Sequence, residues 1–213
     1  MTLEIEYQGP KRGVDRAVLL AHGAGADMHA VTLTTVADAL ADARVPSLRF
    51  RFPYRSAGRR APDRPPVLAA AVREAAAELA RRTRLPPERL VLGGRSMGGR
   101  VCSLVVGHDA DPLPALGLVL LGYPLHPPGK PDQVRSEHFP RLRVPCLFVH
   151  GTRDAFGSPD ELRAAARKVR GRVSWHWIDT ADHGFEPLKS SGLTQAEALA
   201  GAAAAVVDFV TSR

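Results

Sequence analysis

The segment Arg89-Leu-Val-Leu-Gly-Gly-Arg-Ser-Met-Gly-Gly-Arg100 joins an apolar run to a dense cluster of glycines. The run up to Gly93 is typical of a buried strand, and an apolar helix is expected from Met97 onward. Between them, residues 94–98 match the pattern Gly-x-Ser-x-Gly, in which a serine occupies a sharp turn from strand to helix. The two outer glycines lack the side chains that would clash where strand and helix pack closely. The segment therefore predicts a strand, turn and helix that raise Ser96 above a sheet.

Two later loops carry the partners that a serine nucleophile requires. The hydroxyl needs a base to take its proton, and the base needs an acid to orient it. Asp154 follows a strand expected over Pro145–Val149, and His183 follows a strand expected over Val173–Ile178. The order serine, aspartate, histidine along the chain is one of the known orders of such triads. We therefore predict Ser96 as nucleophile, His183 as base and Asp154 as the orienting acid.

Other residues are weaker candidates for these roles. Asp182 neighbours the histidine but occupies a turn, which makes it the second choice for the acid. Asp160 lies in the expected first turn of a helix, where a carboxylate stabilises the helix dipole. His150 precedes a glycine at a strand end and is expected to be a hydrogen-bonded structural residue. The alternative is that the segment is only a glycine-rich turn and that Asp154 and His183 are surface residues. This alternative is less favoured, because all three residues fall in loops that follow strands, in the order expected for a triad.

The backbone near the serine is expected to stabilise the oxyanion that forms during the reaction. One donor is the N–H of Met97. The second is expected in the loop after the strand Ala17–Ala21, with Ala24 as first choice and Gly25 as second. Losing one such donor typically lowers the rate about a hundredfold to a thousandfold, so proline at position 24 should not be tolerated. Residues expected at the pocket are Gly25, Tyr123, His126 and Arg55.

Short apolar runs alternate with longer amphipathic ones along the chain. The expected strands are Leu3–Tyr7, Ala17–Ala21, Ser47–Phe52, Arg89–Gly93, Leu118–Leu121, Pro145–Val149 and Val173–Ile178. A helix is expected over Val67–Arg82, whose apolar residues share one face, and capping boxes at Ser158 and Thr194 predict two more. This alternation indicates an α/β fold with a mostly parallel sheet and helices on both faces. Pro53–Pro66 and Tyr123–Leu142 are expected to be long loops at the edge where such sheets bind ligands.

Composition limits the class of protein. The chain has 213 residues, 45% hydrophobic and 24% charged, which is typical of one globular domain spanning 1–213. Cys102 and Cys146 lie in apolar runs, which argues against a disulfide framework, and no metal-ligand spacing is present. The N-terminal sequence lacks the pattern of a signal peptide, and no apolar stretch approaches the roughly 20 residues that span a bilayer. A cytoplasmic protein without a membrane span is therefore expected.

The net charge of +7 raises the question of an anionic partner. Of the 29 basic residues, 25 are arginines, and the region 49–64 contains six of them. A nucleic-acid surface there is disfavoured because Phe50, Phe52 and Tyr54 interleave with the arginines, as core-facing residues of a strand would. A further possibility is that arginines of this region reach the pocket mouth and favour an anionic acyl group; these are Arg55, Arg59 and Arg60.

Six segments together resemble the α/β-hydrolase superfamily, in its small lidless branch near dienelactone hydrolases. They are LLAHGAGADM at 19–28, RFRFPYRSAGRRAPDR at 49–64, LGGRSMGGR at 92–100, LLGYPLHPPGKPDQVR at 120–135, LFVHGTRDAFG at 147–157 and IDTADHGF at 178–185. The likeness is closest to the hydrolases related to testis-expressed and histone-acetyltransferase-complex-associated hydrolase-like proteins. It implies a sheet of seven or eight strands with the first antiparallel, the triad Ser96, Asp154 and His183, no cofactor and no cap domain. Dienelactone hydrolases use a cysteine where this chain has Ser96.

These observations predict a serine ester hydrolase of the carboxylesterase or thioesterase type. It is expected to cleave small or medium acyl esters through an acyl-enzyme on Ser96. Expected partners are a small-molecule ester or thioester and no nucleic acid, with the protein a monomer or homodimer. The alternative is a non-catalytic interaction scaffold with the same fold, since folds are reused for other functions.

Overall fold

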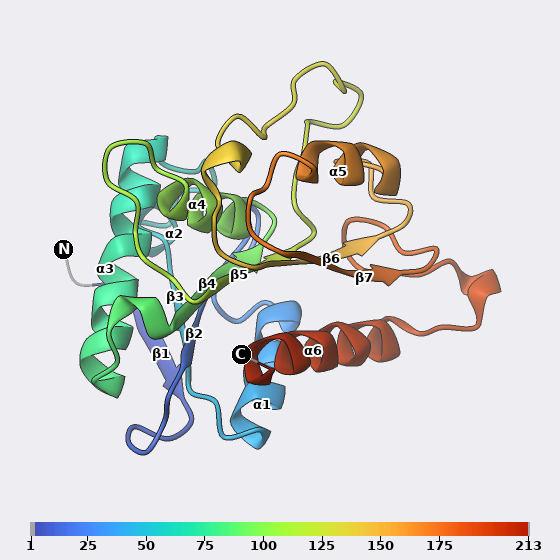
Figure 1. Ribbon diagram of the computed structural model, residues 1–213. Helices are drawn as coiled ribbons and strands as arrows, with labels where there is room; N and C mark the ends of the chain where they lie inside the picture. The colour runs from blue at the N-terminus through green and yellow to red at the C-terminus, as the bar shows by residue number, and fades with distance from the viewer. Residues whose placement is uncertain (1–2, 213) are drawn as a thin grey trace.

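The computed structural model describes residues 3–212, which form a seven-stranded sheet with helices on both faces (Figure 1). The strand order is β1-β3-β2-β4-β5-β6-β7. The strands are β1 Ile5–Gln8, β2 Ala17–Ala21, β3 Ser47–Phe50, β4 Leu90–Arg95, β5 Gly117–Leu121, β6 Cys146–Gly151 and β7 Val173–Ile178. β1 pairs antiparallel with β3, and the other neighbours pair in parallel. The predicted fold class is confirmed.

Alternate residues of the central strands supply two hydrophobic cores. Ala17 and Leu19 of β2 belong to one core, whereas Val18 and Leu20 belong to the other, because successive strand side chains point to opposite faces. The first core lies under α3 (Pro65–Thr83), α4 (Met97–Val106) and α5 (Pro159–Ala166). The second lies under α1 (Val31–Asp42) and α6 (Gln195–Thr211), on the opposite side of the sheet in Figure 1.

Local start signals account for most of the helices. Ser158 and Thr194 both form the predicted capping boxes, at the starts of α5 and α6. The helix α1 was not predicted, because its N-cap residue Ala30 makes no side-chain hydrogen bond and leaves no capping pattern in the sequence. No helix within residues 3–212 is long and apolar enough to cross a membrane.

One predicted loop is wrong. Pro53–Pro66 contains the short helix α2 (Pro53–Ser56) and the first residues of α3. Proline stands at the start of both helices, where its fixed φ suits the helix and its missing N–H costs nothing. The second predicted loop, between β5 and β6, is irregular apart from one 3-10 turn, η2 (Phe139–Arg141). Two other 3-10 turns are η1 (Pro87–Arg89) and η3 (Lys189–Ser191).

Candidate active site

Ser96 occupies a strained turn between β4 and α4. Its φ of 49° and ψ of −116° lie where residues other than glycine are uncommon. A Cβ atom would lie 2.0 Å from the Ala21 carbonyl oxygen if placed at Gly94, and 2.3 Å from it if placed at Gly98. The turn therefore packs against the end of β2 at a distance that only glycine permits. β4 continues to Arg95, two residues beyond the predicted end at Gly93.

Ser96, His183 and Asp154 form a continuous chain of hydrogen bonds. The Nε2 atom of His183 lies 2.9 Å from Ser96 Oγ, and its Nδ1 atom lies 2.6 Å from Asp154 Oδ2. An ionised carboxylate only accepts hydrogen bonds, so the imidazole proton is assigned to Nδ1. Nε2 is then left to accept the hydrogen bond of the serine hydroxyl. The arrangement suits removal of the Ser96 proton by His183.

The buried Asp154 carboxylate is held in its ionised form. Burial by itself would raise the pKa of Asp154, but the hydrogen bond from His183 and the nearby charges hold it below its usual value. The Phe156 N–H donates to Asp154 Oδ1 at 2.8 Å, and His150 Nε2 lies 3.3 Å from Oδ2. His150 Nε2 is also 2.9 Å from the Gly157 carbonyl oxygen, and burial lowers its pKa. Asp154 therefore lies between two histidines.

Asp182, the second choice for the acid, has a different set of partners. Its Oδ1 atom accepts hydrogen bonds from the N–H groups of Gly184 at 2.7 Å and Glu186 at 3.0 Å. These bonds close the turn that carries His183. Asp182 thus shapes the loop, and Asp154 makes the contact with the imidazole.

The loop after β2 lies against the serine. A Cβ atom at Gly23 would lie 3.6 Å from Ser96 Cβ. Tyr54 of α2 donates a hydrogen bond from its hydroxyl to the Ala24 carbonyl oxygen at 2.8 Å. His22 accepts from the Phe52 N–H on Nε2 at 3.0 Å, which leaves its Nδ1–H to donate to the Gly23 carbonyl oxygen at 2.8 Å. Burial lowers the pKa of His22 and favours this neutral form.

Comparison with known proteins agrees with this architecture. Residues 14–211 match the alpha/beta hydrolase domain family. The chain belongs to the alpha/beta hydrolase family. This α/β hydrolase is similar to Est1E from Butyrivibrio proteoclasticus, solved with ferulic acid, at 14% identity and a TM-score of 0.75, covering 99% of this chain and 94% of that one.

Two other solved structures show the same fold. Dienelactone hydrolase from Anabaena variabilis is 20% identical with a TM-score of 0.68, covering 99% of this chain and 89% of that one. The monoacylglycerol lipase of Paleococcus ferrophilus is 17% identical with a TM-score of 0.71, covering 100% of this chain and 99% of that one. At these identities the likeness shows the fold, and membership of the small lidless branch stays a prediction.

The structure separates the four expected pocket residues of this α/β hydrolase. Tyr123 is 1% exposed and lies in the hydrophobic core, where its hydroxyl donates to the Arg135 carbonyl oxygen at 2.6 Å. His126 is also buried, with Nδ1 2.9 Å from the Pro127 carbonyl oxygen. The His126 Nε2 atom lies 3.5 Å from a carboxylate oxygen of Glu161 in α5, and the placement of Tyr123 and His126 at a pocket stays a prediction. A Cβ atom at Gly25 would meet no atom within 4 Å, and Arg55 is half-buried in α2.

Sequence reasoning missed Arg95, the residue before the serine. Its Nη1 atom lies 3.5 Å from His183 Nε2 and donates to the Leu121 carbonyl oxygen at 3.2 Å. The guanidinium carbon lies 4.7 Å from the centre of the Phe185 ring. Burial lowers the pKa of Arg95 to about 10, so the group stays positively charged at neutral pH. Its position in the Gly-x-Ser-x-Gly pattern is a signal that could have found it.

Three of the six arginines of region 49–64 are paired with acids within the described residues. Arg49 lies 2.7 Å from Glu6, Arg51 lies 2.6 Å from Glu4, and Arg59 lies 2.6 Å from Asp63. The interleaved aromatic residues Phe50, Phe52 and Tyr54 are fully buried, as the sequence predicted. Within residues 3–212, no group of three or more His, Cys, Asp or Glu side chains is placed to hold a metal ion.

Proposed function

We propose that this α/β hydrolase is a serine ester hydrolase of the carboxylesterase or thioesterase type. The observation that carries the proposal is the hydrogen-bond chain Ser96, His183 and Asp154 at the strained turn after β4. Each contact has the length that proton transfer requires, and the acid is buried and ionised. A surface serine with incidental neighbours would not need a turn of this conformation.

The first half of the reaction makes an acyl-enzyme. Ser96 Oγ attacks the ester carbonyl carbon while His183 Nε2 takes the hydroxyl proton, and Asp154 stabilises the imidazolium that forms. The N–H groups of Met97 and Ala24 hold the oxyanion of the tetrahedral intermediate. The carbon–oxygen bond of the ester, or the carbon–sulfur bond of a thioester, then breaks. The proton on His183 passes to the leaving alcohol or thiol.

The second half releases the acid. His183 takes a proton from water, the resulting hydroxide attacks the acyl carbonyl, and the bond to Ser96 Oγ breaks as the serine regains its proton. Met97 begins α4, so the positive end of the helix dipole faces the oxyanion in both halves. The Tyr54 hydroxyl holds the Ala24 carbonyl, in the peptide unit that follows the Ala24 N–H, and so helps to fix the conformation of this loop.

The named relatives favour an ester substrate. Est1E is described with bound ferulic acid, and the Paleococcus protein is a monoacylglycerol lipase. Both have the fold of this chain over nearly its whole length. An acyl ester is therefore the class of substrate to test first.

A fluorophosphonate probe tests the nucleophile directly. The wild-type protein should be labelled and should hydrolyse p-nitrophenyl esters of small or medium acyl groups, whereas Ser96→Ala should not be labelled and should lose at least about 10⁴-fold in kcat. Ser103→Ala is the matched control, because Ser103 Oγ also contacts a histidine, His138, at 2.8 Å but is buried. Its labelling should persist. Undiminished labelling of Ser96→Ala, or no ester turnover that depends on Ser96, would reject the proposal in favour of a scaffold role.

A further inference from the structure

An apolar groove runs between α3 and α4. It has a volume of about 600 Å³, and Met97, the residue after Ser96, lines it. Its apolar walls include Leu68 and Ala69 of α3 and Val101 and Leu104 of α4. The groove therefore offers an apolar surface that starts at Met97, the residue after the nucleophile.

One face of α4 sets what such a chain would meet. Four residues of α4 line the groove with the spacing i, i+3, i+4, i+7, which places them on the same face of the helix: Met97, Arg100, Val101 and Leu104. Arg100 lies one turn beyond Met97, about 4.5 Å farther along the helix axis. The Arg100 cation therefore lies about one helical turn from Met97, the predicted oxyanion donor.

Arg100 has no acidic partner among residues 3–212. No carboxylate lies within 4.0 Å of its guanidinium, and its Nε atom is buried without a hydrogen-bond partner. A half-buried guanidinium without an acidic partner can form a charge-assisted hydrogen bond with a ligand carboxylate. By contrast, Arg73 farther along the groove lies 3.2 Å from Asp111, and Arg141 donates to the Gly107 carbonyl oxygen at 2.7 Å.

Three other arginines also form no ion pair within the described residues. Burial and the nearby charge of Arg100 lower the pKa of Arg135, while the charge of Glu137 acts in the opposite direction. Arg95 beside His183 and Arg55 near the Ala24 loop likewise form no ion pair within the described part of the chain. The charges of Asp154 and Asp182 nevertheless act on the Arg95 guanidinium, whereas none of the described acids is paired with Arg100.

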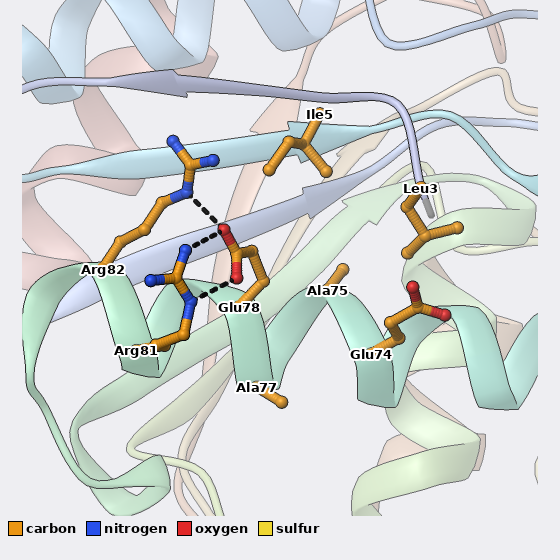
Figure 2. A pocket seen from close by; sticks show the side chains of 8 residues that line it. All are labelled: Leu3, Ile5, Glu74, Ala75, Ala77, Glu78, Arg81 and Arg82. Atoms are coloured by element: carbon orange, nitrogen blue, oxygen red, sulfur yellow. Dashed lines mark hydrogen bonds and ion pairs between the residues drawn. The ribbon is translucent and has the colours of Figure 1, made fainter. Parts of the chain in front are cut away.

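A second groove, between β1 and α3, is different (Figure 2). There Glu78 binds both arginines of the rim, with its oxygens 2.7 Å from Arg81 Nε and 2.7 Å from Arg82 Nε. Both cations of that groove are therefore paired within the protein. Of these two grooves, the one that begins at Met97 combines an apolar wall with an unpaired cation.

We propose that the acyl group cleaved at Ser96 carries a carboxylate at its far end, which binds Arg100 while the chain lies in the α3–α4 groove. This inference rests on the proposed function. The substrate class is then the monoester or monothioester of a linear dicarboxylic acid. Ester hydrolysis consumes one water, releases the alcohol and leaves a dicarboxylate, with bonds and protons moving as in the two half-reactions above.

Matched pairs of ethyl esters test the charge. Each monoethyl ester of a linear dicarboxylic acid is compared with the ethyl ester of the monocarboxylic acid of equal carbon number, and the free acid is quantified by mass spectrometry. Wild-type kcat/KM should favour the anionic ester at least about tenfold at its best chain length, as expected for a charge-assisted hydrogen bond. In Arg100→Gln this anionic-to-neutral ratio should fall about tenfold or more. In Arg167→Gln, which removes the same charge at the exposed end of α5, the ratio should not change.

A second variant tests the groove without altering charge. Ala69 is half-buried in the groove wall, and Ala69→Phe should fill the space. The variant should lower kcat/KM for the longer dicarboxylic monoesters more than for ethyl acetate. Equal losses for both would overturn the placement of the chain.

The outcomes separate this inference from the proposed function. If Ser96 is labelled by the fluorophosphonate and esters are cleaved, but the anionic-to-neutral ratio is near one or does not respond to Arg100→Gln, the carboxylate site is wrong and the hydrolase remains. If Ser96 is not labelled and no ester is cleaved, both fail together.

Discussion

At the scale of single residues, the site depends on strain at Ser96 that its neighbours make possible. The serine adopts a positive φ because Gly94 and Gly98 let the turn lie against the Ala21 carbonyl. That position brings the hydroxyl within hydrogen-bond distance of His183. The Gly-x-Ser-x-Gly pattern predicts the turn itself, whereas the contact of its two glycines with Ala21 is made by packing against β2.

Gly98→Ala tests the close approach. The added Cβ would lie 2.3 Å from the Ala21 carbonyl oxygen, so backbone must move, and we expect a loss of about 1–3 kcal/mol in the free energy of unfolding. Gly25→Ala is the control, because a Cβ there meets no atom within 4 Å and stability should change by less than about 0.5 kcal/mol. Urea unfolding followed by circular dichroism measures both. Equal stability of the two variants would contradict the packing described.

At the scale of elements, α2 connects the sheet to the loop that faces the serine. Pro53 begins this four-residue helix directly after Phe52, and Tyr54 then reaches the Ala24 carbonyl. The alternation of Phe50, Phe52 and Tyr54 predicted that these rings would be buried. It did not predict the helix or the contact with Ala24, because the partner lies 30 residues away in the chain.

Tyr54→Phe tests the role of this contact. Removing the hydroxyl frees the Ala24 carbonyl and loosens the loop that presents the Ala24 N–H, so we expect kcat for ester hydrolysis to fall about tenfold, less than the loss of a complete oxyanion donor. Tyr123→Phe is the matched control, because its hydroxyl also donates to a backbone carbonyl, that of Arg135, but lies in the core. Both variants should lose about 1 kcal/mol of stability. An equal fall in kcat for the two would indicate a general loss of structure and not a positioned loop.

At the scale of the whole molecule, burial fixes the charge state of several histidines. His22, His138 and His150 are each at most 1% exposed, and burial lowers the pKa of all three. For His138, burial and the charges of Arg100 and Arg141 lower the pKa to about 4. The unfolded chain binds that proton near pH 6.5, so the unfolded state holds more protons between these values. Stability must therefore fall as the pH decreases from 6.5 toward 4.

His138→Gln isolates this effect. The neutral side chain cannot take up a proton, so the variant should lose about 3 kcal/mol less stability than the wild type between pH 7 and pH 4. The variant starts from a lower stability at pH 7 because the contact with Ser103 is altered. Urea unfolding at intervals of half a pH unit gives the two slopes. Parallel slopes would contradict the low pKa of His138.

The sequence by itself determined the seven strands, most of the long helices, the turn at Ser96 and the loops that carry Asp154 and His183. These features arise from short-range rules, namely side-chain period, capping and the conformational freedom of glycine, which a single stretch of chain contains in full. The tertiary structure alone decided which distant groups meet. It placed Tyr123 in the core, bound Arg49, Arg51 and Arg59 to acids, and left Arg100 without one. Whether a charged side chain is paired depends on the residues that packing brings next to it. Most of those residues lie far away in the chain, so no local sequence pattern identifies them.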